Sequence, residues 1–93
     1  MRRIERTKTF KRDYQRAIAM PKHRDLDNLL PAVLMLLASN TTLPTQYLDH
    51  APNGEGKDFR DCHVKPDLVL IYRKAGNDVL QLVRLGSHSQ LGF

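Results

Sequence analysis

The 93 residues are enough for one domain, so residues 1–93 are interpreted as a single unit near the lower size limit for a self-sufficient hydrophobic core. Hydrophobic residues make up 41% of the chain and charged residues 27%, a balance typical of a folded domain and not of a disordered segment. No apolar run is long enough to span a membrane or form a signal peptide, and the single cysteine, Cys62, excludes an internal disulfide, so we expect a cytoplasmic protein without membrane association.

The net charge of +5 is concentrated near the N-terminus. Residues 1–24 contain nine Lys or Arg and two acidic residues, a net charge of +7, whereas residues 25–93 have a net charge of −2. Such a basic segment indicates a polyanionic partner, either a nucleic acid or an acidic protein. The alternative is a solvated helix face that only keeps the protein soluble.

The first predicted elements are a short strand over residues 2–6 and an amphipathic helix that ends at Met20-Pro21. Either Thr7 or Thr9 can cap the start of this helix. One face of the helix is apolar and carries, at every fourth position, Phe10, Tyr14 and Ile18. The other face is basic and carries Lys8, Lys11, Arg12 and Arg16.

A second helix is predicted to start at Asp25 or Asp27 and to stop at the segment that begins with Asn40. Its broad apolar stripe consists of Leu26, Leu29, Leu30, Val33, Leu34 and Leu37. Pro31 lies past the first turn of this helix, which leaves two alternatives: a kink at Pro31, or a helix that begins near it.

The second half of the chain is predicted to consist mainly of strands. A long polar connection over residues 41–57 precedes strands at 58–64, 67–74 and 79–86, and residues 74–78 have the composition of a hairpin turn. The β-α-α-β-β-β order predicts a single α+β domain, in which two N-terminal helices pack on a mainly antiparallel four-stranded sheet.

Histidines in this second half are candidates for acid–base chemistry, because histidine titrates near neutral pH and can both accept and return a proton. His50 lies in the long connection. Alternation along the first of the three strands predicts His63 on the face opposite Cys62 and Val64, which are better core residues. Cys62 is therefore interpreted as a small buried hydrophobic residue and not as a nucleophile.

An arginine in the last strand is also unusual. The same alternation predicts Arg84 on one face with Leu80 and Leu82. A guanidinium in line with core residues needs an anionic partner, which an anion-binding site at the end of that line would supply. If Gly86 does not interrupt the strand, His88 follows on the same face.

Each of these residues also has a purely structural interpretation. Arg84 could pair with Asp61 or Asp67, Asp67 has the composition of a turn residue, and His88 could belong to a frayed terminus. A zinc site is not supported, because the sequence lacks a tight pair of histidines such as HxxxH. From these residues alone, the structural and the catalytic interpretations both stay open.

Two segments of the chain resemble a known family. YLDHAPNGEGKDFRDCHVKPDLVLIYR at residues 47–73 and LVRLGSHSQL at residues 82–91 resemble the RelE/ParE superfamily of bacterial toxins, and most closely its YafQ-like branch of ribosome-dependent mRNA endonucleases. The chain departs from the family pattern at three positions. Phe59 stands where the family has a tyrosine, Leu68 where it has a tryptophan, and Phe93 lies one place later than the family's C-terminal phenylalanine.

The resemblance implies a RelE-like fold and a metal-independent endoribonuclease without a cofactor, which cuts mRNA in the ribosomal A site. The substrate 2′-OH would attack the adjacent phosphate, which requires a base, an acid and cationic support for the transition state. The matching catalytic positions are His50, His63, Asp67, Arg84 and His88. His88 is the first choice for the acid, His63 or Asp67 for the base, Arg84 for the phosphate charge, and His50 for a helper; the acid and base roles could be exchanged.

The resemblance also implies a toxin of a type II toxin–antitoxin system, which a cognate acidic antitoxin holds inactive and which reaches operator DNA only through the antitoxin complex. The residues expected to contact the ribosome or the mRNA are Lys8, Lys11, Arg12, Arg16 and, as a base-stacking residue, Phe93. Two other functions are compatible with the same fold: a ParE-like, non-catalytic inhibitor of DNA gyrase, and a non-toxic RNA-binding relative.

Overall fold

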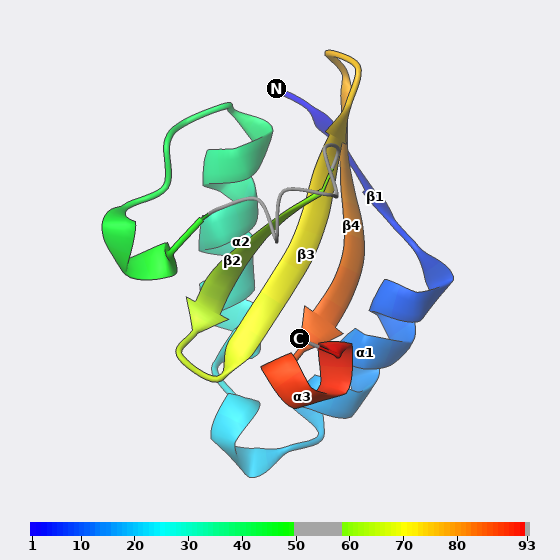
Figure 1. The fold of residues 1–93 in the computed structure, drawn as a ribbon, viewed down its shortest axis with the longest axis vertical. Helices are drawn as coiled ribbons and strands as arrows, with labels where there is room; N and C mark the ends of the chain where they lie inside the picture. Colours follow the sequence, from blue (N-terminus) through cyan, green and yellow to red (C-terminus); the bar gives the residue numbers. More distant parts are fainter. Residues whose placement is uncertain (50–58, 93) are drawn as a thin grey trace.

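The sheet at the centre of the molecule has four strands in the order β1-β4-β3-β2, and three helices pack on it (Figure 1). The structure is a computed structural model that describes residues 1–49 and 59–92. The strands are β1 (Arg3–Arg6), β2 (Arg60–Lys65), β3 (Leu68–Ala75) and β4 (Val79–Gly86). The helices are α1 (Lys8–Ile18), α2 (Leu26–Ala38) and the short α3 (His88–Leu91), with 3-10 turns at Pro21–His23 and Thr45–Tyr47.

The sheet is mixed. Strand β3 is antiparallel to both β2 and β4, whereas β1 is parallel to β4. In Figure 1, α2 lies behind the sheet, α1 lies beside β1 and β4, and α3 lies in front of the sheet at the end of β4. The predicted α+β fold with two N-terminal helices on a mainly antiparallel sheet is therefore confirmed, and α3 is an addition that the sequence pattern does not predict.

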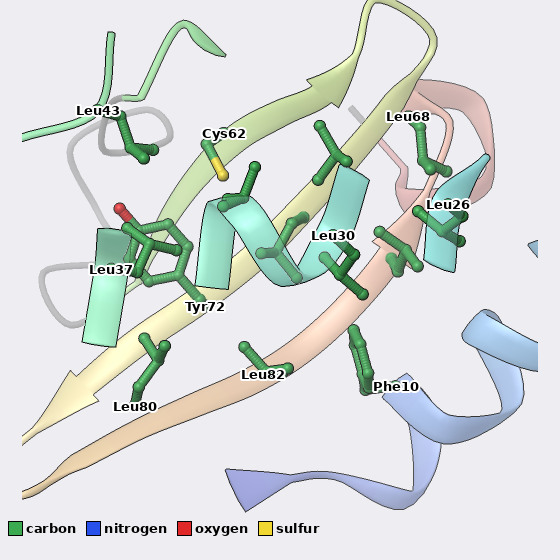
Figure 2. Packing of buried hydrophobic residues seen from close by; sticks show 14 of the residues in the cluster. Phe10, Leu26, Leu30, Leu37, Leu43, Cys62, Leu68, Tyr72, Leu80 and Leu82 are labelled. Carbon is green, nitrogen blue, oxygen red and sulfur yellow. The ribbon is translucent and has the colours of Figure 1, made fainter. Parts of the chain in front are cut away.

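The core lies between α2 and the sheet face that α2 covers (Figure 2). Leu30 and Leu37 of α2 belong to one buried cluster with Tyr72 of β3 and Leu82 of β4, and Phe10 joins this cluster from α1. Each fully buried side chain of this size contributes about 1.5–3 kcal/mol relative to its exposed state. The apolar stripe of α2 thus covers one face of the sheet and leaves the opposite face available for other residues.

Alternation along β2 follows the prediction. Cys62 and Val64 are buried in the core, whereas His63 between them is half-buried on the opposite face. Burial raises the pKa of the Cys62 thiol to about 12, so the thiol stays protonated and is a poor nucleophile. The interpretation of Cys62 as a small core residue is confirmed.

The structure decides where the two long helices start. The Thr7 hydroxyl accepts a hydrogen bond from the Phe10 backbone N–H at 2.9 Å, so Thr7 and not Thr9 caps α1. Helix α2 begins at Leu26 and runs through Pro31, so the alternative start near Pro31 is wrong. Pro31 has no N–H to donate to the backbone carbonyl of Asp27, but Asp27 is exposed, so water can bind this carbonyl instead.

No helix within residues 1–49 and 59–92 is long and apolar enough to cross a membrane.

A β-bulge in β4 overturns one prediction about Arg84. Ile71 of β3 pairs with Arg84 and Tyr72 pairs with Leu82, which leaves Val83 as the extra residue. The bulge reverses the alternation, so Leu85 and not Arg84 continues the buried row of Leu82. Arg84 is therefore on the sheet face opposite the core, and the prediction that it lies in line with Leu80 and Leu82 is wrong.

The C-terminal end of β4 differs from a simple continuation of the strand. Gly86 ends β4, and Ser87 caps α3 in a capping box with Gln90, so His88 starts a helix and does not extend the strand. A Cβ atom at position 86 would lie 2.9 Å from the Gln90 side-chain oxygen, so a larger residue would displace Gln90 from the capping box. The tight Gly86–Ser87 connection folds α3 back over the sheet.

Candidate active site

Strand pairing sets two neighbouring rows of residues on the sheet face opposite the core. One row contains His63, Val69 and Gly86. The next row contains Asp61, Ile71 and Arg84. Because alternate residues of a strand point to the same face, both rows face the side of the sheet on which α3 lies (Figure 1).

Two of the predicted catalytic histidines meet on this face. The rings of His63 from β2 and His88 from α3 have centroids 5.1 Å apart and an interplanar angle of 61°, an edge-to-face contact. His63 is half-buried and His88 is exposed, so solvent and substrate can reach the pair. A hollow of about 240 Å³ opens beside His63 and is lined by Gln46, Tyr47, His63, Val64, Lys65 and Pro66.

Arg84 has a partner that the sequence analysis missed. Its Nε donates to Asp13 Oδ2 at 2.8 Å and its Nη2 donates to Asp13 Oδ1 at 3.3 Å. This hydrogen-bonded carboxylate raises the pKa of Arg84, which therefore stays charged. The alternative interpretation of Arg84 named Asp61 and Asp67 as partners and did not include Asp13, which α1 brings to the end of β4.

A signal for Asp13 was present in the sequence. Asp13 lies three residues after Phe10 and four before Ala17, and all three side chains are buried on one line of α1. A carboxylate on the buried line of a helix needs a cation or several donors. The regular spacing instead indicated Phe10, Tyr14 and Ile18 as the buried face of the helix, but Tyr14 and Ile18 are only partly buried.

Asp67 lies in the turn between β2 and β3. Its carboxylate forms an ion pair with Lys22 at 2.9 Å, and both side chains are about half exposed. The hydrogen bond from Lys22 lowers the pKa of Asp67, which stays ionised but is a weaker base than a free carboxylate. The structure thus brings His63 and His88 into contact, whereas Asp67 pairs with Lys22.

Two predicted site residues, His50 and Phe93, lie outside the described residues. The residue before His50 is anchored to the sheet: Asp49 Oδ1 accepts from the Tyr72 hydroxyl at 2.5 Å and from Arg60 Nε at 3.3 Å. At the position where the family has a tyrosine, the ring centroid of Phe59 lies 5.9 Å from the guanidinium carbon of Arg73.

The four basic residues predicted on the outside of α1 are all exposed: Lys8, Lys11, Arg12 and Arg16. They are not equivalent, because Arg16 Nη2 donates to Asp13 Oδ1 at 2.9 Å. Arg16 therefore shares the Asp13 carboxylate with Arg84, whereas Lys8 and Arg12 face solvent. The prediction that these residues contact RNA or the ribosome remains a prediction.

A groove of about 690 Å³ runs between α1, α2 and β1, away from the two histidines. Its apolar lining consists of Ile4, Phe10, Tyr14, Leu30, Pro31, Leu34 and Leu82. Arg6 and Lys11 also line the groove. We refer to it below as the α1–α2 groove.

Among the residues that the structure describes, no group of three or more His, Cys, Asp or Glu is arranged to hold a metal ion. On the sheet face opposite the core, the histidine pair can transfer protons and Arg84 can stabilise an anion.

Similar proteins identify the family to which this arrangement belongs. The family model described as "Bacterial toxin of type II toxin-antitoxin system, YafQ" matches residues 2–92. The mRNA interferase toxin YafQ of Escherichia coli K12 is 34% identical over 90 residues, which cover 97% of this chain and 95% of that protein.

Solved structures agree with this assignment. The crystal structure of the E. coli DinJ–YafQ complex matches with a TM-score of 0.83 and 36% identity, and the match covers 98% of each chain. A metal-bound toxin from Helicobacter pylori matches with a TM-score of 0.84 and 46% identity, covering 98% of this chain and 99% of that one. The match extends over the sheet, α1 and α2 together with the C-terminal helix, and the chain belongs to the YafQ family of bacterial toxins of type II toxin–antitoxin systems.

Proposed function

We propose that this toxin is a ribosome-dependent endoribonuclease that cleaves mRNA without a catalytic metal. The observation that carries the proposal is the contact between His63 and His88, with ring centroids 5.1 Å apart, on the sheet face that also bears Arg84. Support also comes from the 34% identity to a relative named as an mRNA interferase.

The proposed reaction uses only side chains. A base removes the proton of the substrate 2′-OH, the oxygen attacks the adjacent phosphorus, and an acid protonates the departing 5′ oxygen, which leaves a 2′,3′-cyclic phosphate and a 5′-OH. We assign the acid to His88 and the base to His63. Asp67 is less suited to the role of base, because its ion pair with Lys22 lowers its pKa. Arg84 stabilises the charge that develops on the phosphate oxygens.

We assign His50 to substrate contact or proton transfer, by its position in the family pattern. The anchoring of Asp49 by Tyr72 and Arg60 supports this assignment, since it ties the residue beside His50 to the sheet. Phe93 is assigned to base stacking on the same ground of family position.

The partner of this toxin is proposed to be a cognate antitoxin, as the YafQ of E. coli was crystallised in a complex with DinJ. The α1–α2 groove suits a helical antitoxin segment with an apolar face and acidic flanks, because its lining is mainly apolar and its two basic residues, Arg6 and Lys11, outnumber the single acidic one, Asp27. Such a toxin–antitoxin complex would be the form that binds operator DNA.

The test of the catalytic proposal is cleavage of ribosome-bound mRNA by the His88→Gln and His63→Gln variants. Each is expected to cut about 10²–10⁴-fold more slowly than the unmodified toxin, because it can no longer transfer a proton. Asn77→Ala, in the turn between β3 and β4, is the control and should cut at the unmodified rate.

The products are part of this test. Fragments should end in a 2′,3′-cyclic phosphate, and protein freed of transition metals should retain its rate. Undiminished cleavage by the His63→Gln/His88→Gln double variant would contradict the proposal. DNA damage with intact mRNA would support the gyrase-inhibitor alternative, and RNA binding without cleavage would support the non-toxic relative.

A further inference from the structure

One buried ionised group has no part in the reaction as described above. Asp13 lies in the middle of α1, and only 4% of its side chain is exposed. A carboxylate this deeply buried is costly unless several donors surround it. Asp13 therefore calls for an explanation beyond the general stability of α1.

The hydrogen-bond donors around Asp13 come from the end of β4 and from α1 itself. Oδ2 accepts from Arg84 Nε at 2.8 Å and from the Leu85 backbone N–H at 3.0 Å. Oδ1 accepts from Arg16 Nη2 at 2.9 Å and from Arg84 Nη2 at 3.3 Å. One carboxylate thus binds both the side chain of Arg84 and the backbone of the residue that follows it.

This bonding fixes the orientation of the guanidinium. Two bonds along the Nε–Nη2 edge hold the plane of the group, since a carboxylate and this edge match in geometry. The opposite side, at Nη1, has no hydrogen bond to Asp13 and is directed away from it. The Arg84 side chain is 34% exposed, so a substrate anion can reach part of it.

The backbone bond extends the effect to the neighbouring site residue. The bulge at Val83 turns Arg84 to the open face of the sheet, and the bond to Leu85 N–H stabilises the segment directly after the bulge. Gly86, Ser87 and His88 follow at once, and His88 contacts His63. The same carboxylate therefore holds the segment that carries two of the proposed catalytic side chains.

We infer that Asp13 is a positioning residue for the cleavage reaction, which holds Arg84 with its Nη1 side toward the scissile phosphate. The inference rests on the proposed function, in which Arg84 stabilises the phosphate charge. The competing explanation is that Arg84 only neutralises a buried carboxylate and takes no part in the reaction.

The kinetic test is a double-mutant cycle of Asp13→Asn and Arg84→Gln, read as the single-turnover cleavage rate at saturating ribosomes. Asp13→Asn should lower this rate by about 10²-fold, the cost of a misplaced catalytic group, with ribosome affinity retained. In the Arg84→Gln background the same substitution should cost less than about threefold, because there is no guanidinium left to position and the asparagine amide oxygen can still accept from the Leu85 N–H. Asp78→Asn, an exposed carboxylate in the β3–β4 turn, is the matched control.

Two kinetic outcomes overturn the inference. Equal losses from Asp13→Asn in both backgrounds would indicate a general structural role. If Arg84→Gln cleaves at the unmodified rate, Arg84 takes no part in the reaction and Asp13 has no catalytic group to position. The His88→Gln variant would still test the proposed cleavage reaction separately. If Asp13→Asn does not fold, Asp13→Glu replaces it, since it keeps the charge and displaces the carboxylate by one methylene.

A second measurement does not depend on activity. The ¹H–¹⁵N nuclear Overhauser effect of the Arg84 Nε–H reports its motion, and it should be that of an ordered group in the unmodified protein. In Asp13→Asn it should fall to the value of an exposed arginine such as Arg24, whereas Asp78→Asn should leave it unchanged. An unchanged value in Asp13→Asn would overturn the inference even if the toxin cleaves as proposed, and a toxin that does not cleave would refute the proposed function alone.

Discussion

At the scale of single residues, His23 is another buried titratable group, at the end of the 3-10 turn Pro21–His23. It is 3% exposed, and its Nδ1 has no hydrogen-bond partner among the described residues. Burial lowers the pKa of His23, and four charged neighbours act on it in opposite directions: Lys65 and Lys22 lower the pKa, whereas Asp67 and Asp25 raise it. The folded protein therefore favours the neutral imidazole.

The consequence is a pH dependence of stability. Because the unfolded chain binds the proton more readily, the free energy of unfolding should be constant above about pH 7 and should decrease as the pH falls below the unfolded pKa of about 6.5. Urea unfolding between about pH 7.5 and 5 measures this decrease, and the His23→Leu variant should lack it. An identical slope in His23→Leu would assign the effect to other groups. Asp25 and Asp67, whose pKa values are lowered by Lys65 and Lys22, lose their contribution only at more acidic pH.

At the scale of secondary-structure elements, α1 has two distinct faces. Its buried line carries Asp13 toward Arg84, and its exposed side carries the basic residues. Arg16 belongs to both, because it also bonds Asp13. A test of the basic side must therefore leave Arg16 unchanged, and Lys8 and Arg12, one helical turn apart and both exposed, are the residues to reverse.

Reversal of Lys8 and Arg12 to Glu should weaken ribosome binding, since each basic side chain that binds a phosphate releases counterions from the RNA. The slope of log affinity against log salt should become shallower by about 0.7–0.9 for each phosphate that is no longer bound. The control is the charge-matched pair Arg24→Glu and Lys74→Glu, which lies outside α1. If both pairs change the slope equally, only net charge matters and α1 is no more than a solvated surface.

At the scale of the whole molecule, the open sheet face and the α1–α2 groove are separate surfaces. The groove contains Ile4, which is 41% exposed on β1, an edge strand whose four residues are all exposed. An antitoxin segment bound in this groove would contact α1 and leave the histidines uncovered. Because Asp13 of the same helix bonds Arg84, such a segment would bind the helix that holds Arg84.

A charge in the groove should therefore disrupt antitoxin binding. Ile4→Arg is expected to weaken the affinity for the cognate antitoxin by at least about tenfold, because it introduces an unpaired cation into an apolar contact. Met35→Arg is the control, since Met35 is an exposed apolar residue of α2 outside the groove. Isothermal titration calorimetry measures both. Equal affinities of the two variants would exclude the groove as the antitoxin surface.

Features that depend on neighbouring residues could be read from the sequence. The start of α1 was narrowed to Thr7 or Thr9, the β3–β4 turn follows from a short Gly-containing segment, and the orientation of His63 follows from its alternation with Cys62 and Val64. The order of the elements and the α+β fold follow from these local patterns. The family resemblance pointed to the site residues, and within the described part of the chain the structure brings His63 and His88 together.

Other features were decided only by the tertiary structure. The bulge at Val83 depends on the pairing of β4 with β3, whereas the capping box of α3 is local to Ser87 and Gln90 and was a sequence signal that the strand prediction missed. The partner of Arg84 lies 71 residues earlier in the chain. No local pattern encodes such a pair, because a buried carboxylate and a guanidinium need each other only after the helix and the strand have packed and water has been excluded between them.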